Sequence, residues 1–223
     1  FYRWLMRGGI VDQDPVALAQ KPKRPLRIPV WLEREEQAQL EATIRDRRNI
    51  PINVFGRNQQ RMTDTRRRYE MLFGLLLNSG LRISEALGLK VSDVRLVEGI
   101  AKSVRVIGKG NKERWVPLPA AFAQVFGFWL KDRPRGEAVF AKADGKPISP
   151  QAARAYLRGM LEKAGIEKKI SPHKLRHTYA TNLLNAGAEL VDIKALLGHE
   201  SVATTQIYTN VGQERMEKVV GRL

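Results

Sequence analysis

Two short runs of β-type residues, separated by a glycine-bearing loop, constrain the fold of this chain more than any other feature. Residues 102–107 read KSVRVI and residues 113–118 read ERWVPL, with GKGNK between them. Such a pair predicts an antiparallel β-hairpin. Because the segments on both sides are predicted to be helical, we expect an α+β fold that is mainly α, with a small antiparallel β-sheet.

The predicted helices are delimited by capping residues and by glycine and proline. The best delimited helix runs from Ser171 to Gly187, because Ser171 can cap its N-terminus and Pro172 occupies its first position. Ser84 is expected to cap a short helix that ends near Gly88. The other predicted helices cover residues 33–45, 66–79, 151–164, 189–197 and a C-terminal segment from about residue 201.

Two segments without helical periodicity interrupt this pattern. Residues 10–30 contain three prolines and the basic run KPKRPLR, and proline disfavours helix, so we expect an extended linker there. Residues 46–65 are polar and basic and are predicted to form a loop, which is either a disordered insertion or an added phosphate contact. The arginines in or beside this loop are Arg45, Arg47, Arg48, Arg57 and Arg61.

The chain is strongly basic, with 39 Lys and Arg residues against 23 Asp and Glu residues and a formal net charge of +16. A polyanion is the natural partner of such a chain, because each neutralised phosphate releases condensed counterions. Binding to a membrane surface would favour one basic amphipathic helix, whereas the basic residues here are spread over the whole chain. We therefore predict a polyanionic partner and no membrane partner.

The composition also excludes several kinds of chemistry. The absence of cysteine excludes disulfides, cysteine-ligated zinc and a cysteine nucleophile, and with three histidines and no HExxH spacing we predict no metal and no other cofactor. The longest apolar stretch, Met71 to Leu77, is too short to cross a bilayer, and no signal-peptide core opens the chain. We therefore expect a soluble protein of a reducing cytoplasm. Because no initiator Met precedes Phe1, we also expect a fragment of a longer chain.

His173 and Arg176 are candidates for phosphate chemistry. They lie one turn apart on the same face of a predicted helix, close to its N-terminus. The free N–H groups and positive partial charge of a helix N-terminus favour a phosphate, and an arginine can hold two phosphate oxygens. On this segment alone, a surface histidine and a solvated arginine are an equally good interpretation.

Four further residues are each ambiguous when they are considered singly. Arg82 could be a surface cation, and Lys109 in the hairpin loop could simply be solvated. His199 follows a predicted helix end. Tyr208 lies in TTQIYT, and a single helical tyrosine is more often a core residue than a nucleophile.

Four motifs occur in this chain in a characteristic order. They are GLRISEALGL, VIGKGNKERWVPL, SPHKLRHTYAT and LLGHESVATTQIYT. Together, over about residues 69–215, they closely resemble the tyrosine recombinase family, with the Xer recombinases and phage integrases as the nearest subgroups. The resemblance implies the catalytic residues Arg82, Lys109, His173, Arg176, His199 and Tyr208, with Glu85 as a supporting residue that braces Arg82.

The resemblance implies two domains and a site-specific DNA recombinase that acts without metal or ATP. Residues 1–28 would be the end of an N-terminal core-binding domain and a basic linker, and residues 29–223 the catalytic domain. Arg82 and Arg176 would neutralise charge on the non-bridging phosphate oxygens. Tyr208 would attack phosphorus to give a 3′-phosphotyrosyl link, with His173 as general base and Lys109 as general acid. Strand exchange would pass through a Holliday junction.

The resemblance also implies the partners and the place of action. We expect double-stranded DNA with a specific target site, a homotetramer assembled on DNA through the C-terminal helix 212–223, and a cytoplasmic, nucleoid-associated location. The apolar stripe of that helix could instead pack on its own domain. The stripe comprises Met216, Val219, Val220 and Leu223.

Two other functions would use similar residues. A type IB topoisomerase shares this kind of site but relaxes supercoils, and the short chain and the Xer-like motifs argue against it. A catalytically inactive DNA-binding protein is a further alternative, which nothing in the sequence favours because no catalytic position is substituted.

Overall fold

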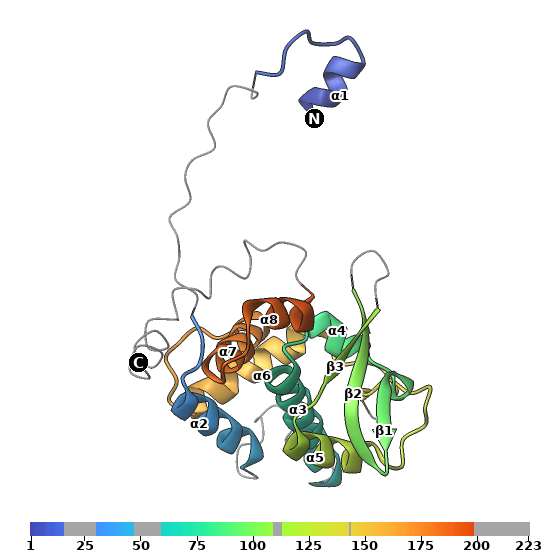
Figure 1. Cartoon of the computed structure of the whole chain (residues 1–223), viewed down its shortest axis with the longest axis vertical. Helices are drawn as coiled ribbons and strands as arrows, with labels where there is room; N and C mark the ends of the chain where they lie inside the picture. Colours follow the sequence, from blue (N-terminus) through green and yellow to red (C-terminus); the bar gives the residue numbers. More distant parts are fainter. Residues whose placement is uncertain (16–29, 47–58, 109–112, 143, 199–223) are drawn as a thin grey trace.

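The predicted β-hairpin is present and forms part of a three-stranded antiparallel sheet in the order β1-β2-β3 (Figure 1). The computed structural model describes residues 1–15, 30–46, 59–108, 113–142 and 144–198. Along the chain the helices and strands are α1 (Tyr2–Arg7), α2 (Arg34–Arg45), α3 (Gln59–Ser79), α4 (Ile83–Gly88), the 3-10 helix η2 (Val91–Asp93), β1 (Val94–Val97), β2 (Ile100–Ile107), β3 (Glu113–Pro117), α5 (Ala120–Leu130), α6 (Pro150–Lys163), α7 (Pro172–Asn185) and α8 (Leu190–Leu197). The mainly helical α+β fold is therefore confirmed.

The sheet is larger than the predicted hairpin, because β1 pairs with β2 on the side away from β3. The turn between β1 and β2 lies against α5. A side chain at Gly127 of α5 would place its Cβ 2.1 Å from the carbonyl oxygen of Gly99 in this turn, so only glycine allows the helix to approach so closely. α5 packs on β2 in this way. Neither β1 nor α5 is among the elements predicted from the sequence.

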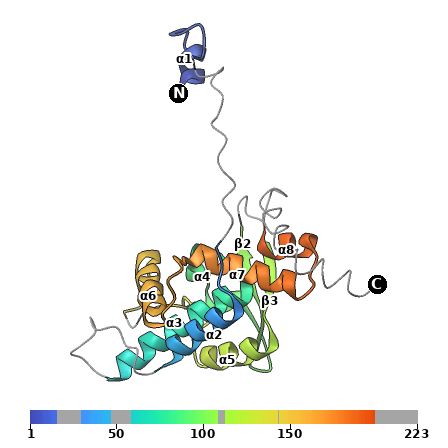
Figure 2. The ribbon, with the colours of Figure 1, turned by 90° about the vertical axis from the view of Figure 1, so that its left-hand side faces the viewer.

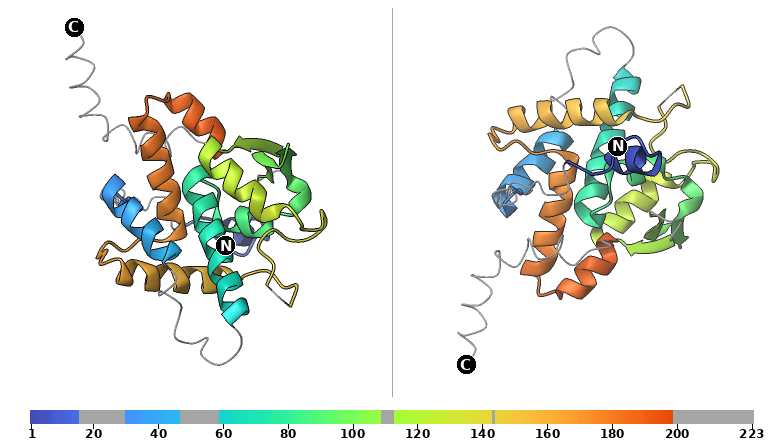
Figure 3. Two further views of the ribbon diagram at one scale, coloured as in Figure 1. Left: turned by 90° about the horizontal axis from the view of Figure 1, so that it is seen from below. Right: turned by 90° about the horizontal axis from the view of Figure 1, so that it is seen from above.

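α3 is the centre of the helical part. It packs against α2, α4, α5 and α7, and the views from below and above show it running between its neighbours (Figure 3). Leu72, Leu75 and Leu76 in its middle are completely buried. The rings of Tyr69 on α3 and Tyr156 on α6 stack with their centroids 3.9 Å apart, which joins α6 to this core.

The prediction of a loop at residues 46–65 is partly wrong. α3 begins at Gln59 rather than at residue 66. The first turns of this helix read QQRMTDT, and such a polar stretch lacks the apolar periodicity that marks a helix in a sequence. Residues 47–58, which include three of the arginines of the predicted loop, lie outside the described residues.

The helix caps differ in detail from the prediction. α4 begins at Ile83 with Arg82 as its N-cap residue, so Ser84 lies inside the helix and does not cap it. α7 runs from Pro172 to Asn185, close to the predicted span, although Ser171 at its N-cap makes no side-chain capping bond. At α4 the capping acceptor is Glu85, as the site geometry below shows.

Within the described ranges, no helix has the length and apolar character of a membrane span. The same residues contain no group of three His, Asp or Glu side chains placed to hold a metal ion. Residues 16–29 of the predicted linker, Lys109 in the hairpin, and residues 199–223 with His199, Tyr208 and the C-terminal helix lie outside the described residues.

Candidate active site

Arg82 is an exposed arginine held at the start of α4 by Glu85. Arg82 Nη1 donates to Glu85 Oε1 at 2.9 Å, and the backbone N–H of Arg82 donates to Glu85 Oε2 at 2.9 Å. The side chain of Arg82 is 44% exposed, whereas that of Glu85 is 9% exposed. Glu85 thus holds both the backbone and the guanidinium of an arginine that still faces solvent. The contact expected from the sequence exists, and its role in catalysis stays a prediction.

Arg114 on β3 shares the same carboxylate. Its Nη1 donates to Glu85 Oε1 at 3.2 Å and its Nη2 to Glu85 Oε2 at 2.9 Å, while its Nε donates to the carbonyl oxygen of Leu196 in α8 at 3.2 Å. Arg114 is not among the site residues predicted from the sequence. One signal could have identified it: strand alternation puts Arg114 on the same face as the buried Val116, and a charge on a core-facing side needs a partner.

Glu85 remains ionised between these two arginines. Burial alone would raise the pKa of Glu85, but the hydrogen bonds from Arg114 and Arg82 and the charge of Arg114 outweigh burial, so its pKa lies below the ordinary value. Two guanidinium charges against one carboxylate leave a single positive charge on this group of three residues. The group therefore favours an anion near the exposed Arg82.

Arg176 is a buried arginine of α7 and is only 2% exposed. Its Nη1 donates to the carbonyl oxygen of Gly80, which follows α3, at 2.8 Å, and its Nη2 donates to the carbonyl oxygen of Leu197, the last residue of α8. Gly80 has φ +60°, and a Cβ there would lie 2.4 Å from the Tyr179 ring. The absence of a side chain at Gly80 thus allows α7 to pack closely enough for Arg176 to reach that carbonyl.

His173 lies in the first turn of α7, and its side chain reaches solvent. The surrounding protein still removes enough water to lower its pKa, and the positive charges of Arg176 and Arg82 lower it further. Its ring also meets the His177 ring edge to face at 4.7 Å between centroids. Arg176 lies one turn after His173 and donates to the carbonyl of Gly80, two residues before Arg82, so the fold brings these three predicted residues into one neighbourhood.

The C-terminal end of α8 adjoins this environment. Arg114 binds the carbonyl of Leu196 and Arg176 binds that of Leu197, and Gly198 then ends the helix with φ +66°. α8 packs against β3, and Figure 2 shows the two elements side by side. Of the predicted site residues, the structure thus brings together Arg82, Glu85, His173 and Arg176. The others, Lys109, His199 and Tyr208, are not described.

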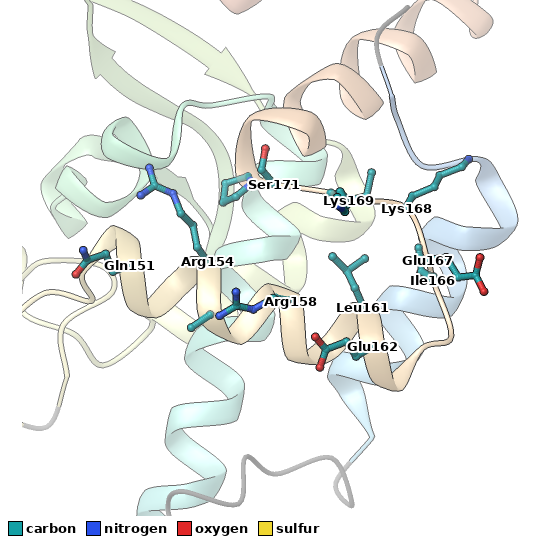
Figure 4. A pocket seen from close by; sticks show the side chains of 13 residues that line it. Gln151, Arg154, Arg158, Leu161, Glu162, Ile166, Glu167, Lys168, Lys169 and Ser171 are labelled. Atoms are coloured by element: carbon teal, nitrogen blue, oxygen red, sulfur yellow. The ribbon is translucent and has the colours of Figure 1, made fainter.

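A basic cleft lies beside α6. It has a volume of about 740 Å³ and is bordered by α6 and the segment 166–172 that leads into α7 (Figure 4). Arg154 and Arg158 are exposed one turn apart on α6, and Lys168 and Lys169 line the cleft from the following segment. Two acidic residues, Glu162 and Glu167, also line it, so its basic residues outnumber its acidic ones by four to two. Lys168 is partly neutralised, because its Nζ lies 2.7 Å from Glu36 Oε2. The cleft ends at Pro172, next to His173, so its positive charge adjoins the site.

The chain is similar to known proteins in sequence and in fold. The profile of the phage integrase family matches residues 57–215. Tyrosine recombinase XerC of Pelobacter propionicus is 36% identical over 222 residues, which are 98% of this chain and 68% of that protein. The crystal structure of XerA recombinase aligns with a TM-score of 0.67 at 29% identity, covering 91% of this chain and 66% of that one.

A DNA complex is also among the similar structures. XerH recombinase bound to a palindromic difH substrate, in a post-cleavage complex, aligns with a TM-score of 0.71 at 25% identity and covers 90% of this chain and 55% of that chain. The chain therefore spans about two thirds of the curated relative and a smaller share of this solved one.

The small antiparallel sheet among helices is the catalytic-domain fold of enzymes that cleave and rejoin DNA strands. The chain belongs to the phage integrase family, the tyrosine recombinases.

Proposed function

We propose that this chain is the catalytic part of a site-specific DNA recombinase that cuts and rejoins strands through Tyr208. The observation that carries the proposal is that Arg176, one turn after His173 on α7, donates to the carbonyl oxygen of Gly80, two residues before Arg82. In the proposed division, residues 1–28 end a DNA-clamping domain and residues 29–223 form the catalytic domain. The reaction needs no ATP, because the covalent phosphotyrosyl link conserves the energy of the broken bond, and no metal, because arginine and histidine side chains neutralise the charge on the phosphate oxygens.

The two arginines supply positive charge in different ways. Arg82 reaches solvent and can donate directly to a non-bridging phosphate oxygen, while Glu85 holds it in place. Arg176 lies almost completely buried beneath the site and adds a second positive charge that little water screens. Charge that develops on the phosphorane oxygens is stabilised most by groups that are already oriented.

His173 suits the role of general base. Its lowered pKa keeps the imidazole neutral at pH 7, which leaves a nitrogen able to accept the proton of a tyrosine hydroxyl. An unperturbed tyrosine has a pKa of about 10, so the attacking oxygen needs such an acceptor. In this proposal Tyr208 attacks phosphorus, the 5′-oxygen leaves, and a 3′-phosphotyrosyl bond remains.

Two other proposed catalytic residues directly follow described segments in the sequence. Lys109 follows the end of β2 after Gly108, and in the proposal it protonates the leaving 5′-oxygen. His199 follows Gly198 at the end of α8 and donates to a phosphate oxygen. That Lys109 and His199 directly follow these two segments in the sequence supports their proposed roles.

Double-stranded DNA is the proposed partner, in line with the net charge of +16 and with the DNA-bound XerH relative. We further propose that the protein acts on chromosome-associated DNA as a homotetramer joined through residues 212–223. Two duplexes then exchange strands in pairs through a Holliday junction.

The decisive experiment traps the covalent intermediate. The full chain is incubated with suicide duplexes that carry a nick and a randomised site, so that the short 5′-hydroxyl fragment diffuses away after cleavage. Adducts recovered under denaturing conditions are sequenced to define the target. We expect a 3′-linked adduct with the native chain and none with Tyr208→Phe.

Tyr2→Phe in α1 is the matched control and should form the adduct at the native rate. An adduct that persists in Tyr208→Phe would show that another nucleophile acts and would overturn the proposal. Relaxation of a supercoiled plasmid carrying a single target site would instead indicate a topoisomerase.

A further inference from the structure

Arg114 lies where three elements of the site meet. It belongs to β3 but bonds to Glu85 of α4 and to the carbonyl oxygen of Leu196 in α8. Its side chain is 16% exposed, so little of the guanidinium reaches solvent. Arg114 therefore contacts two elements that carry or precede proposed catalytic residues and is itself largely covered.

The contact with Glu85 is a two-bond fork. Arg114 Nη1 and Nη2 each bond one oxygen of the carboxylate, at 3.2 and 2.9 Å. Arg82 Nη1 shares only Oε1 of that carboxylate, at 2.9 Å. Because Arg114 fixes the plane of the carboxylate, it also fixes the direction in which Glu85 Oε1 accepts the hydrogen bond from Arg82.

The contact with α8 is equally close. Besides the bond from Nε to the carbonyl of Leu196, the guanidinium packs on the backbone of Gly198, where a Cβ would lie only 3.1 Å from Arg114 Nη1. The last turn of α8 therefore rests on Arg114. The chain continues from this turn into His199.

The charge balance gives Arg114 a second effect. Without it, the nearly buried carboxylate of Glu85 would have Arg82 as its one arginine among the described residues, and the pair would be neutral. Arg82 would then be drawn towards Glu85 instead of towards a phosphate. With Arg114 present, the carboxylate is shared and one positive charge remains for the substrate.

We propose that Arg114 is a positioning residue for strand cleavage, which holds the Glu85–Arg82 pair and the end of α8 in a fixed relation without contacting the phosphate. This inference rests on the proposed recombinase function. A side chain that only positions others affects the rate of the chemical step more than it affects DNA binding.

The test compares Arg114→Gln with a matched variant of the same sheet, Arg105→Gln. Arg105 on β2 also forms two ion pairs, with Asp93 and Glu113, but these lie away from Glu85. Single-turnover adduct formation is measured on the suicide duplex at saturating protein, and DNA affinity by fluorescence anisotropy. We expect Arg114→Gln to slow adduct formation by up to about 100-fold, the cost that misplacing a reacting group by about 1 Å can reach. DNA affinity should change far less than the rate, and Arg105→Gln should match the native chain in both respects.

Arg114→Lys serves as the conservative variant and guards against misfolding. A lysine keeps the charge next to Glu85 but cannot form the fork and the Leu196 bond together, so the rate should recover in part. Adding Glu85→Gln to Arg114→Gln should slow cleavage by less than the product of the two single effects, because the two residues share their effect on Arg82.

Two results would overturn the inference. One is an Arg114→Gln rate within twofold of Arg105→Gln, and the other is a loss of affinity as large as the loss of rate. Either result leaves the proposed function intact, since that depends on the Tyr208-dependent adduct of the native chain. If the native chain forms no such adduct, the proposed function itself fails.

Discussion

Arg176 reaches from the second turn of α7 to the carbonyl oxygen of Leu197, the last residue of α8, while its other Nη binds the carbonyl of Gly80. A buried guanidinium thus joins the ends of two helices beside the proposed site. Arg82, by contrast, is bound by a side chain and faces solvent. The family resemblance gives both arginines the same role. Their different surroundings predict that replacing Arg176 mainly lowers stability, whereas replacing Arg82 mainly lowers the cleavage rate.

Arg176→Gln should lower the free energy of unfolding, because two buried carbonyls lose a charged donor; the expected loss is about 2 kcal/mol. Arg82→Gln should change stability by less than about 1 kcal/mol, as is usual for an exposed ion pair, while it slows cleavage by about 10²–10³-fold. Urea unfolding and single-turnover cleavage measure the two effects. Equal stability losses in both variants would contradict this division of roles.

The acidic limit of cleavage should reflect His173. Its folded pKa is lowered, so the second-order cleavage rate at subsaturating protein should fall with acidification at a midpoint below about pH 6.5, the ordinary histidine value. Because the folded protein binds this proton more weakly than the unfolded chain, stability should also decline as the pH falls through that range. His173→Gln should cleave slowly, and its cleavage rate should no longer fall with acidification over this range. His177→Gln should keep the native pH dependence of the rate. A midpoint above pH 7 would argue against His173 as the base.

Gly80→Ala should destabilise the protein. The new Cβ would lie 2.4 Å from the Tyr179 ring and 2.7 Å from Leu197, at a residue with φ +60°. Strain at such a position costs about 1–3 kcal/mol. Gly159→Ala in α6 is the matched control, since its Cβ would meet no described atom within 4 Å; it should leave stability unchanged or raise it by up to about 1 kcal/mol. Thermal and urea unfolding compare the two, and equal stabilities would refute the packing argument.

The basic cleft beside α6 should contribute phosphate contacts. Arg154→Gln and Arg158→Gln should each weaken DNA binding on all sequences and reduce the slope of log K against log salt by about 1. Arg95→Gln on the outer strand β1 removes the same charge elsewhere and serves as the control. Anisotropy titrations at several salt concentrations give the slopes. A loss of affinity that is confined to one target sequence would indicate that these arginines contact bases instead of phosphates.

Much of the fold could be predicted because local signals were strong. The hairpin and the helix from Pro172 to Asn185 lie close to their expected places, since alternation and glycine or proline punctuation are local properties. The first turns of α3 were missed because they are polar. Ser84 was wrongly predicted to cap α4, because Glu85 supplies the capping acceptor from the next position.

The order of the motifs was enough to predict which residues are candidates for the site. It was not enough to predict the surroundings of these residues. The order of motifs singled out Arg82, Glu85, His173 and Arg176 in the one-dimensional chain. Their burial, the lowered pKa of His173 and the part played by Arg114 depend on how the helices and the sheet meet. Arg114 bonds to a carbonyl 82 residues away, and every residue carries such an oxygen, so no pattern of side chains marks this partner. Residue types and their spacing therefore sufficed for the class of chemistry, while the burial of Arg176 and the sharing of Glu85 arose only where distant segments pack together.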